Sequence, residues 1–420
     1  MYPQKIHVWN FGPIREADIK LAPLTVIMGQ NNTGKTFLSS LMTLSDILSV
    51  GISIRLREES EEKSVGDEFI RKLQRITINE LKKTYTIANV RELVGRIDDE
   101  TRISFIFGID EIKDLRIDIR FNKDDDLEIS GNFEILFEDK RIKESELMFP
   151  DVIYVPAERS GIMRTYRQLM RLYLEYFWPT IFPEAFKERI EKFLGRKFRI
   201  PGLVGRFLSQ LFAIKQFTRE EYNRSDFKDV LTSLERVLDG FIELTPEFEV
   251  LYHSRHLPQP LSLANTSSMV SELAGLYLMI SLLERGDWLV IEEPESHIHP
   301  QGQMDVARAL VALIRCGSNC LITTHSDLLA LKLAQMVGLE HLSANERRAL
   351  GYGGNEFLRR DEFSLYFMEK FDDGTSKSRK IEISEAGEIE ELPSYSTVVE
   401  QLYGESVELL KLHEKIRSLP

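Results

Sequence analysis

The segment that decides the fold is an eight-residue loop, which reads Gly29-Gln30-Asn31-Asn32-Thr33-Gly34-Lys35-Thr36. It fits the pattern G-x-x-x-x-G-K-[ST]. A short apolar run at residues 24–28 precedes the loop, and residues 36–48 have the apolar spacing of a helix. A buried strand, a glycine-rich loop and a helix in this order predict a phosphate-binding loop, because glycines let backbone N–H groups approach a phosphate closely.

Each part of this loop has an expected task in binding ATP and Mg²⁺. The backbone around the phosphates is expected from Gly29, Asn31, Asn32, Thr33 and Gly34. The N-terminus of the following helix adds partial positive charge. Lys35 neutralises the outer phosphates, and the hydroxyl of Thr36 is placed for Mg²⁺.

Two further strand ends carry polar groups. Residues 288–291 are apolar and lead directly into Glu292 and Glu293, so a buried strand delivers two carboxylates at its carboxyl end. We expect Glu292 to hold Mg²⁺ and Glu293 to orient or deprotonate water. Another short strand, residues 320–323, ends near His325, which we expect to contact the outermost phosphate.

A run of small hydroxyl residues, which includes Ser267 and Ser268, opens an apolar helix shortly before the acidic strand. Two interpretations remain open at this point. Either serine side chains simply cap the helix, or the helix N-terminus faces phosphate groups of a nucleotide bound by a second subunit.

Composition bounds the class of protein. The chain has 420 residues, 43% of them hydrophobic, and a net charge of −13, which together indicate a large globular protein that does not coat nucleic acid over its whole surface. Only two cysteines occur, Cys316 and Cys320, which favours a reducing, cytoplasmic location. The longest apolar stretch, residues 200–214, is too short for a membrane span, so no membrane partner is expected.

Charge is distributed unevenly, however. Residues 159–215 carry 12 Lys/Arg and 4 Asp/Glu, a net charge of +8, which leaves −13 − 8 = −21 for the rest of the chain. Aromatic residues lie between these cations. Such a segment is a candidate DNA-binding or protein-binding surface, and equally a solvated face over an aromatic core.

The predicted organisation is a discontinuous α/β core interrupted by inserts. We assign residues 1–50, 150–160 and 245–345 to a head with a mostly parallel core sheet. Residues 51–150 form a mixed insert, and their alternating pattern from 101 to 148 predicts an antiparallel β lobe. Residues 161–244 form a basic, aromatic helical insert, and residues 346–420 form a C-terminal β/α extension.

The motifs, in this order, resemble the ABC-type P-loop ATPase heads of the SMC, Rad50 and RecF class. The sequence is more closely similar to standalone prokaryotic ATPases related to OLD-type proteins, often called AAA-type ATP-binding proteins. The segments that carry this resemblance are residues 10–14, 29–36, 154–159, 267–268, 292–300 and 323–326.

The resemblance implies an ATPase that dimerises, or forms a higher oligomer, through ATP. Ser267 and Ser268 would contact the nucleotide of the partner subunit, His325 would sense the γ-phosphate, and residues 295–299 would lie at the dimer seam. Met269 departs from the family's usual glycine, which puts the contact across the dimer in doubt.

The expected output is a conformational switch that controls a separate effector, such as a nuclease, in DNA maintenance or phage defence. OLD-type proteins carry a nuclease domain after the ATPase, whereas about 80 residues follow the helix after His325 here. Two alternatives stay open, namely an ABC transporter ATPase subunit and a scaffold that holds ATP without turnover.

Overall fold

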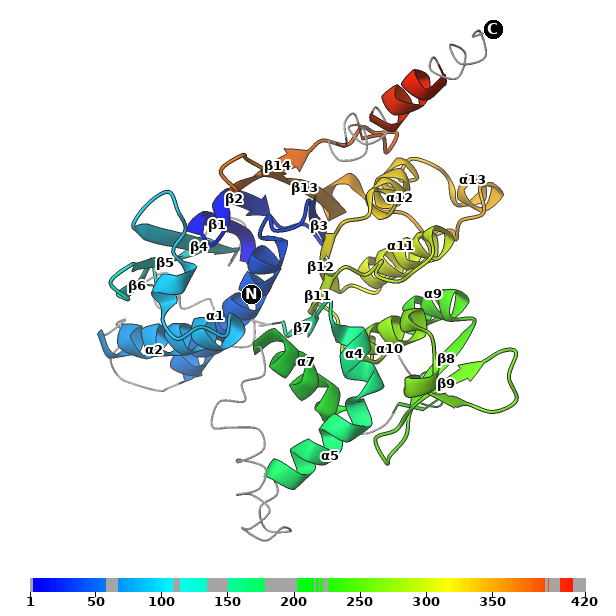
Figure 1. Cartoon of the computed structure of the whole chain (residues 1–420), viewed down its shortest axis with the longest axis horizontal. Helices are drawn as coiled ribbons and strands as arrows, with labels where there is room; N and C mark the ends of the chain where they lie inside the picture. The colour runs from blue at the N-terminus through cyan, green and yellow to red at the C-terminus, as the bar shows by residue number, and fades with distance from the viewer. Residues whose placement is uncertain are drawn as a thin grey trace, which may run out of the picture.

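Two β-sheets and the helices around them make up the described part of the chain. A computed structural model describes residues 3–57, 67–108, 114–133, 150–177, 202–214, 217–218, 220, 222, 226–389, 392 and 401–410. The larger sheet has eleven strands and the smaller sheet has three. Figure 1 shows helices on both sides of the larger sheet.

The larger sheet is mixed, and its parallel half contains the strands at residues 24–29, 152–155, 288–292 and 319–324 of the predicted head, together with the strand at residues 363–370. In spatial order its strands are β6 (Leu127–Gly131), β5 (Asp114–Asn122), β4 (Glu100–Gly108), β1 (Pro3–Phe11), β2 (Ile14–Lys20), β14 (Ser376–Ile381), β13 (Phe363–Lys370), β3 (Leu24–Gly29), β12 (Asn319–Thr324), β11 (Trp288–Glu292) and β7 (Val152–Val155). From β13 to β7, every neighbouring pair is parallel. The predicted α/β class with a parallel core is therefore confirmed.

Alternation along the central strands separates two hydrophobic cores, one on each face of the sheet. Val26 of β3 and Leu289 of β11 belong to one core, whereas Ile27 and Val290, the next residues, belong to the other. All four are almost completely buried. Because successive side chains of a strand point to opposite faces, continuous apolar runs such as these indicate a sheet covered on both sides.

Helices provide the two covers. Their bounds are α1 (Lys35–Arg57), α2 (Asp67–Thr84), α4 (Arg159–Arg164), α5 (Tyr166–Phe177), α7 (Gly202–Ala213), α9 (Lys228–Leu238), α10 (Ser268–Ile280), α11 (Pro300–Arg315), α12 (Asp327–Gly338) and α13 (Ala344–Ala349), with short 3-10 turns η1 (Val90–Leu93), η3 (Leu263–Asn265) and η4 (Arg360–Glu362). Apolar residues of α1 and α2 join one core. Those of α10, α11 and α12 join the other, and Figure 1 shows the two groups on opposite sides of the sheet.

The predicted antiparallel strands are present, but they continue the main sheet. β4 pairs with β5, and β5 pairs with β6, in antiparallel register. β4 also pairs with β1 along most of its length. β6 ends at Gly131, and residues 134–149, which include the end of the predicted antiparallel lobe, lie outside the described part.

Part of the C-terminal extension enters the centre of the sheet. β13 pairs in parallel with β3, the strand before the phosphate-binding loop, and β14 pairs in parallel with β2. At the start of β14, Ser376 donates its backbone N–H to Pro13 O (2.9 Å) and its Oγ–H to Thr33 O (2.7 Å). The hairpin of β13 and β14 therefore supports the loop directly. Residues 401–410 are helical, and the predicted start of that helix near Ser396 lies outside the described residues.

The segment from 159 to 262 contains the remaining helices and the smaller sheet. This sheet is formed by β8 (Gly240–Leu244), β9 (Val250–Ser254) and β10 (Leu261–Ser262). β9 starts two residues later than the predicted strand, because Phe248 has a positive φ of 59° and belongs to the preceding turn. Residues 178–200 of the predicted helical insert lie outside the described part.

Both cysteines lie in the described part of the chain. Cys316 and Cys320 are free thiols, and burial raises the pKa of Cys320. Among the helices that the structure describes, none combines the length and apolar character that crossing a bilayer requires.

Candidate functional site

Three parallel strands end at one edge of the sheet and bring the predicted motifs together. The register pairs Glu292 of β11 with Thr323 of β12, and Thr324 with Met28 of β3. The loop after β3, the glutamates after β11 and the histidine after β12 therefore leave the sheet at the same edge. This is where open α/β sheets bind their ligands.

The loop at residues 29–36 has the backbone shape of a phosphate cradle. Asn32 and Gly34 both have positive φ angles, of 62° and 86°. A Cβ atom added to Gly34 would lie 2.6 Å from Cγ1 of Ile14, so the glycine is required by close packing against the start of β2 as well as by its φ angle. The predicted turn before β2 thus shapes the loop from outside.

Lys35 lies inside this cradle. Its Nζ donates to the carbonyl oxygens of Gly29 (3.0 Å) and Gln30 (2.8 Å), and the residue is 7% exposed. Burial lowers the pKa of Lys35 to about 8, although the nearby carboxylates of Glu293 and Glu295 oppose this shift. An ammonium group held only by loop carbonyls is well placed to pair with an incoming phosphate.

Glu292 is a buried carboxylate between the loop helix and the end of β7. Its oxygens accept hydrogen bonds from Ser39 Oγ (3.2 Å) and the backbone N–H of Ala157 (3.3 Å). Burial raises the pKa of Glu292, and hydrogen bonds from the side chains of Thr36 and Tyr154 oppose that rise.

This carboxylate fits a divalent cation. Among the described residues, no basic nitrogen lies within ion-pair distance of Glu292, so its buried charge has hydrogen-bond donors but no cation. The exposed hydroxyl of Thr36 lies beside it. Carboxylate and hydroxyl oxygens are ligands that Mg²⁺ prefers, and their chemistry matches the predicted metal pair.

Glu293 follows in a left-handed backbone conformation, with a φ of 46°. Its N–H donates to Thr323 O (2.8 Å), and its carboxylate accepts from Ser296 Oγ (3.0 Å). The other carboxylate oxygen lies 3.6 Å from Nε2 of His325. The side chain is 37% exposed, so this carboxylate, unlike that of Glu292, reaches solvent at the edge.

His325 is placed by Glu295. The buried carboxylate of Glu295 accepts from Thr324 Oγ1 (2.7 Å) and from the backbone N–H of His325 (2.8 Å). Burial lowers the pKa of His325, and the positive charge of Lys35 lowers it further, while Glu293 raises it. The imidazole is therefore neutral near pH 7.

The prediction that residues 295–299 form a seam needs correction for two positions. Glu295 is 9% exposed and Ile298 is 6% exposed, so both point into the protein. The exposed residues of this segment are His297 and His299. The reason is that Glu295 ties β11 to β12, which requires its carboxylate on the inner side.

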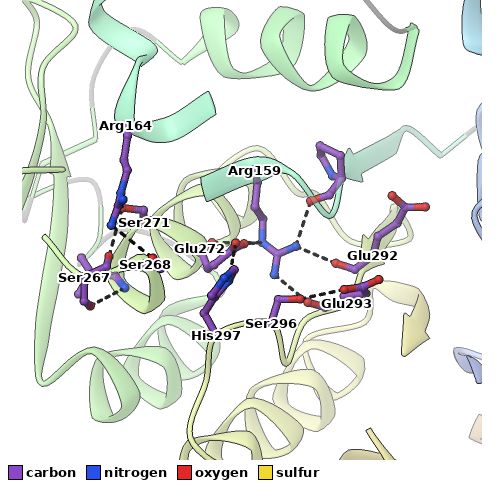
Figure 2. Close-up of polar contacts among 12 residues, drawn as sticks. Arg159, Arg164, Ser267, Ser268, Ser271, Glu272, Glu292, Glu293, Ser296 and His297 are labelled. Carbon is purple, nitrogen blue, oxygen red and sulfur yellow. Dashed lines mark hydrogen bonds and ion pairs between the residues drawn. The ribbon is translucent and has the colours of Figure 1, made fainter. Parts of the chain in front are cut away.

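Arg159 is a site residue that its sequence context did not reveal. It has no exposed surface, and its guanidinium donates to the carbonyl oxygens of Glu292 (2.7 Å), Glu293 (2.9 Å) and Pro156 (3.0 Å). Its Nε lies 3.0 Å from a carboxylate oxygen of Glu272 in α10. Figure 2 shows the guanidinium lying between this helix and the two glutamates.

Two signals in the sequence point to these partners in retrospect. Glu272 is the one charged residue of α10, whose sequence is otherwise apolar or small, and it is 1% exposed. Arg159 lies four residues after Val155, the last residue of the short apolar run at 152–155, where side chains enter the site edge.

Ser267 and Ser268 lie apart from the glutamates, on the far side of Arg159 in Figure 2. Ser267 is the N-cap of α10 and accepts from the backbone N–H of Val270 (3.3 Å). Ser268 Oγ lies 3.4 Å from a guanidinium nitrogen of Arg164, which also donates to Thr266 O (2.9 Å). The capping interpretation thus describes Ser267 within one chain, and the helix start stays accessible beside Arg164.

The basic segment is less basic at its surface than its sequence indicates. Arg159 is buried, Arg164 holds the start of α10, and Arg206 pairs with Asp46 of α1. These three cations are therefore engaged inside the protein. The cations outside the described residues are Lys187, Arg189, Lys192, Arg196, Lys197, Arg199 and Lys215.

Comparison with known proteins adds a family. The family model described as "AAA ATPase domain" matches residues 1–330 of this chain. No curated protein matches the sequence.

Solved structures are similar over most of the chain at low identity. The SMC head domain from Thermotoga maritima shares 11% identity, with 91% of this chain and 100% of that chain covered and a TM-score of 0.42. The Smc head domain with an extended coiled coil, bound to the C-terminal domain of ScpA derived from Pyrococcus furiosus, shares 12% identity, covers 96% and 99%, and has a TM-score of 0.42.

Proposed function

This chain belongs to the AAA ATPase domain family, and we propose that it acts as an ATP-hydrolysing molecular switch that dimerises through ATP. Family membership confirms the predicted class of ATPase, while the closer relation to OLD-type proteins stays a prediction. The observation that carries the proposal is the meeting of Lys35, Glu292, Glu293 and His325 at one sheet edge.

Binding starts at the loop. The ammonium of Lys35 exchanges its loop carbonyl partners for phosphate oxygens, and the N-terminus of α1 adds partial positive charge. Thr36 and Glu292 would hold Mg²⁺. When bound, Mg²⁺ supplies charge neutralisation to the phosphate oxygens.

Glu293 has the exposure and hydrogen bonding suited to orienting the attacking water. Its carboxylate is partly exposed, whereas that of Glu292 is buried and held by donors from α1 and β7. The neutral imidazole of His325 lies beside Glu293 and can donate a hydrogen bond toward the outer phosphate without adding a second cation next to Lys35.

A second subunit would complete the site. Ser267 and Ser268 lie at an accessible helix start away from the glutamates of their own chain (Figure 2). A helix N-terminus favours anionic groups, so the start of α10 suits the phosphates of a nucleotide held by a partner copy. Closure of two copies over ATP, and opening after hydrolysis, would then link nucleotide state to shape.

We propose that this change of shape controls a separate effector, such as a nuclease, in DNA maintenance or phage defence. The resemblance to SMC, Rad50, RecF and OLD-type ATPases supports this setting. DNA contact by the basic segment at residues 159–215 remains part of the proposal. Among its described cations, Arg167 and Arg171 are exposed, and Arg167 also pairs with Glu249.

The experiment is the solution mass of Glu293→Gln, measured by light scattering with and without Mg-ATP. We expect the mass to double with Mg-ATP, because ATP that is bound and not hydrolysed holds the closed dimer. A mass that stays that of a monomer while ATP binds would contradict the contact through Ser267 and Ser268. Phosphate release by the unaltered protein, measured in parallel, separates an ATPase from a scaffold that only holds ATP.

A further inference from the structure

A buried ion pair connects the serine-rich helix to the backbone of the two glutamates. Arg159 and Glu272 are 0% and 1% exposed, and Nε of the arginine lies 3.0 Å from a carboxylate oxygen of the glutamate. Removing both charges from water costs several kcal/mol, so such a pair is weak support for stability alone. A role other than stability must therefore explain why this ion pair lies in the site.

The arginine contributes to the geometry of the acidic strand end. Its two terminal nitrogens donate to the carbonyl oxygens of Glu292 (2.7 Å) and Glu293 (2.9 Å). Glu293 has a φ of 46°, a left-handed conformation that non-glycine residues seldom adopt unless their surroundings hold them there. The planar guanidinium holds the two successive carbonyls with two separate nitrogens in a rigid fork, which fixes their relative orientation.

The glutamate links that arginine to the helix start. Glu272 lies four residues after Ser268, so the two are about one helical turn apart on a similar face. Burial raises the pKa of Glu272, while the charge of Arg159 opposes this rise. Because α10 is a rigid helix with a buried apolar body, a shift at Ser268 moves Glu272 with it.

The other carboxylate oxygen of Glu272 contacts His297, which lies in the turn that follows β11. Nδ1 of His297 lies 3.2 Å from this oxygen. Ser296 donates to the carboxylate of Glu293 (3.0 Å), so the turn after β11 is attached both to the reactive carboxylate and to α10. Figure 2 shows two groups of contacts, one at the serines that begin α10 and one around Arg159 and the two glutamates; α10 itself joins the two groups.

We propose that Arg159 and Glu272 are positioning residues that couple engagement of the α10 N-terminus to the placement of Glu293. This inference rests on the proposed function, because it assigns a regulatory route to the same site. Contact of Ser268 with a partner's nucleotide sets the position of α10, and the ion pair transfers that position to the carbonyls of Glu292 and Glu293. Hydrolysis is then favoured only in the closed dimer.

The experiment compares Glu272→Gln with a matched control, Glu362→Gln, in the full-length protein. Glu362 is also a buried glutamate paired with an arginine, Arg315 of α11, but it lies outside the site. We expect Glu272→Gln to lower kcat by about tenfold or more, since small misplacements of reacting groups are costly. KM and ATP affinity should change by less than about threefold, because the loop and Lys35 are untouched.

Coupling is measured by a double-mutant cycle. Ser268→Ala as a single substitution should lower kcat. It should lower kcat much less when Glu272→Gln is already present, because both changes interrupt one route. Independent roles would make the two losses multiply. If Glu272→Gln does not fold, Glu272→Asp replaces it, since it keeps the charge and withdraws the carboxylate from Arg159 by one methylene.

The outcomes separate this inference from the proposed function. Glu272→Gln or Glu272→Asp with kcat no lower than in Glu362→Gln, or losses that multiply in the cycle, would overturn the coupling while leaving the ATPase intact. An unaltered protein that binds Mg-ATP and releases no phosphate would overturn the proposed function, and the coupling with it.

Discussion

The loop at residues 29–36 and the carboxylate edge lie at the same edge of the sheet, yet they are built in different ways. The loop at residues 29–36 is one continuous segment, and Lys35 contacts carbonyls five and six positions earlier. The edge combines Glu292 and Glu293 with His325 from the next strand and with Arg159, which lies more than a hundred residues earlier. The contacts of Lys35 therefore form between neighbouring residues, whereas the carboxylate edge depends on packing between distant segments.

The variant with the largest expected effect, Glu293→Gln, changes the carboxylate edge and leaves the loop at residues 29–36 untouched. Glu293→Gln should lower kcat by about 10²–10⁴, the usual contribution of a positioned acid or base, and leave ATP affinity nearly unchanged. Phosphate release and equilibrium ATP binding would be measured on the same preparation. If Glu293→Gln kept most of its turnover, water activation would have to be assigned elsewhere.

Lys35→Ala should weaken ATP binding, whereas Glu293→Gln should leave it nearly unchanged. The change at Lys35 removes a charged hydrogen-bond donor from the cradle, so ATP binding should weaken by roughly 100-fold, equivalent to about 2–3 kcal/mol. Titration calorimetry gives the affinity, with Lys332→Ala as control because Lys332 contacts Tyr352 outside the site. Equal losses in the two variants would mean that Lys35 does not face the phosphates.

A pH titration of ATP affinity sharpens the same comparison. The pKa of Lys35 is lowered to about 8, so the lysine is charged at pH 7 and mostly neutral at pH 9. ATP affinity should therefore fall by about tenfold between pH 7 and pH 9. In Lys35→Arg this dependence should disappear, because arginine stays charged throughout. A dependence that persists in this variant would place the titrating group elsewhere.

The smallest expected effect concerns the start of α10. Ser267→Ala removes the helix N-cap and should lower the free energy of unfolding by about 1 kcal/mol. Ser343→Ala removes the N-cap of α13 and serves as the matched control. Denaturant unfolding should show similar losses in both. When each is combined with Glu293→Gln, only Ser267→Ala should also weaken the gain in mass with ATP. Equal gains in mass with Ser267→Ala and Ser343→Ala would leave Ser267 with a capping role alone.

Much of the fold was predictable because its signals are local. Apolar runs ending in Gly29, Glu292 and Thr324 mark buried strands, and parallel strands that share a sheet must place their carboxyl ends together. Strands β13 and β14 fall within the predicted β/α extension, but the place of β13 beside β3 did not follow from the pattern. Strand order depends on pairings across hundreds of residues, and periodicity within one strand does not encode its neighbour.

In the basic segment at residues 159–215, the burial of a charged residue was not predictable from the sequence. Arg159 was grouped with cations that could face DNA, yet it is buried against Glu272 and the backbone carbonyls of Pro156, Glu292 and Glu293. A sequence window shows that a residue is charged but does not show its compensating partner, and burial of a charge depends on that partner. For the same reason Glu295 was assigned to a seam although its carboxylate faces Thr324 and the His325 N–H.

The sequence by itself determined the phosphate loop, the strands that flank it and the identity of the acids and the histidine, because each rests on residues adjacent in the chain. Only the tertiary structure decided which acid is buried, which reaches solvent, and how Arg159 joins α10 to both. Those properties arise where distant segments exclude water from one another, since exclusion of water sets both the pKa of a carboxylate and the strength of its ion pair.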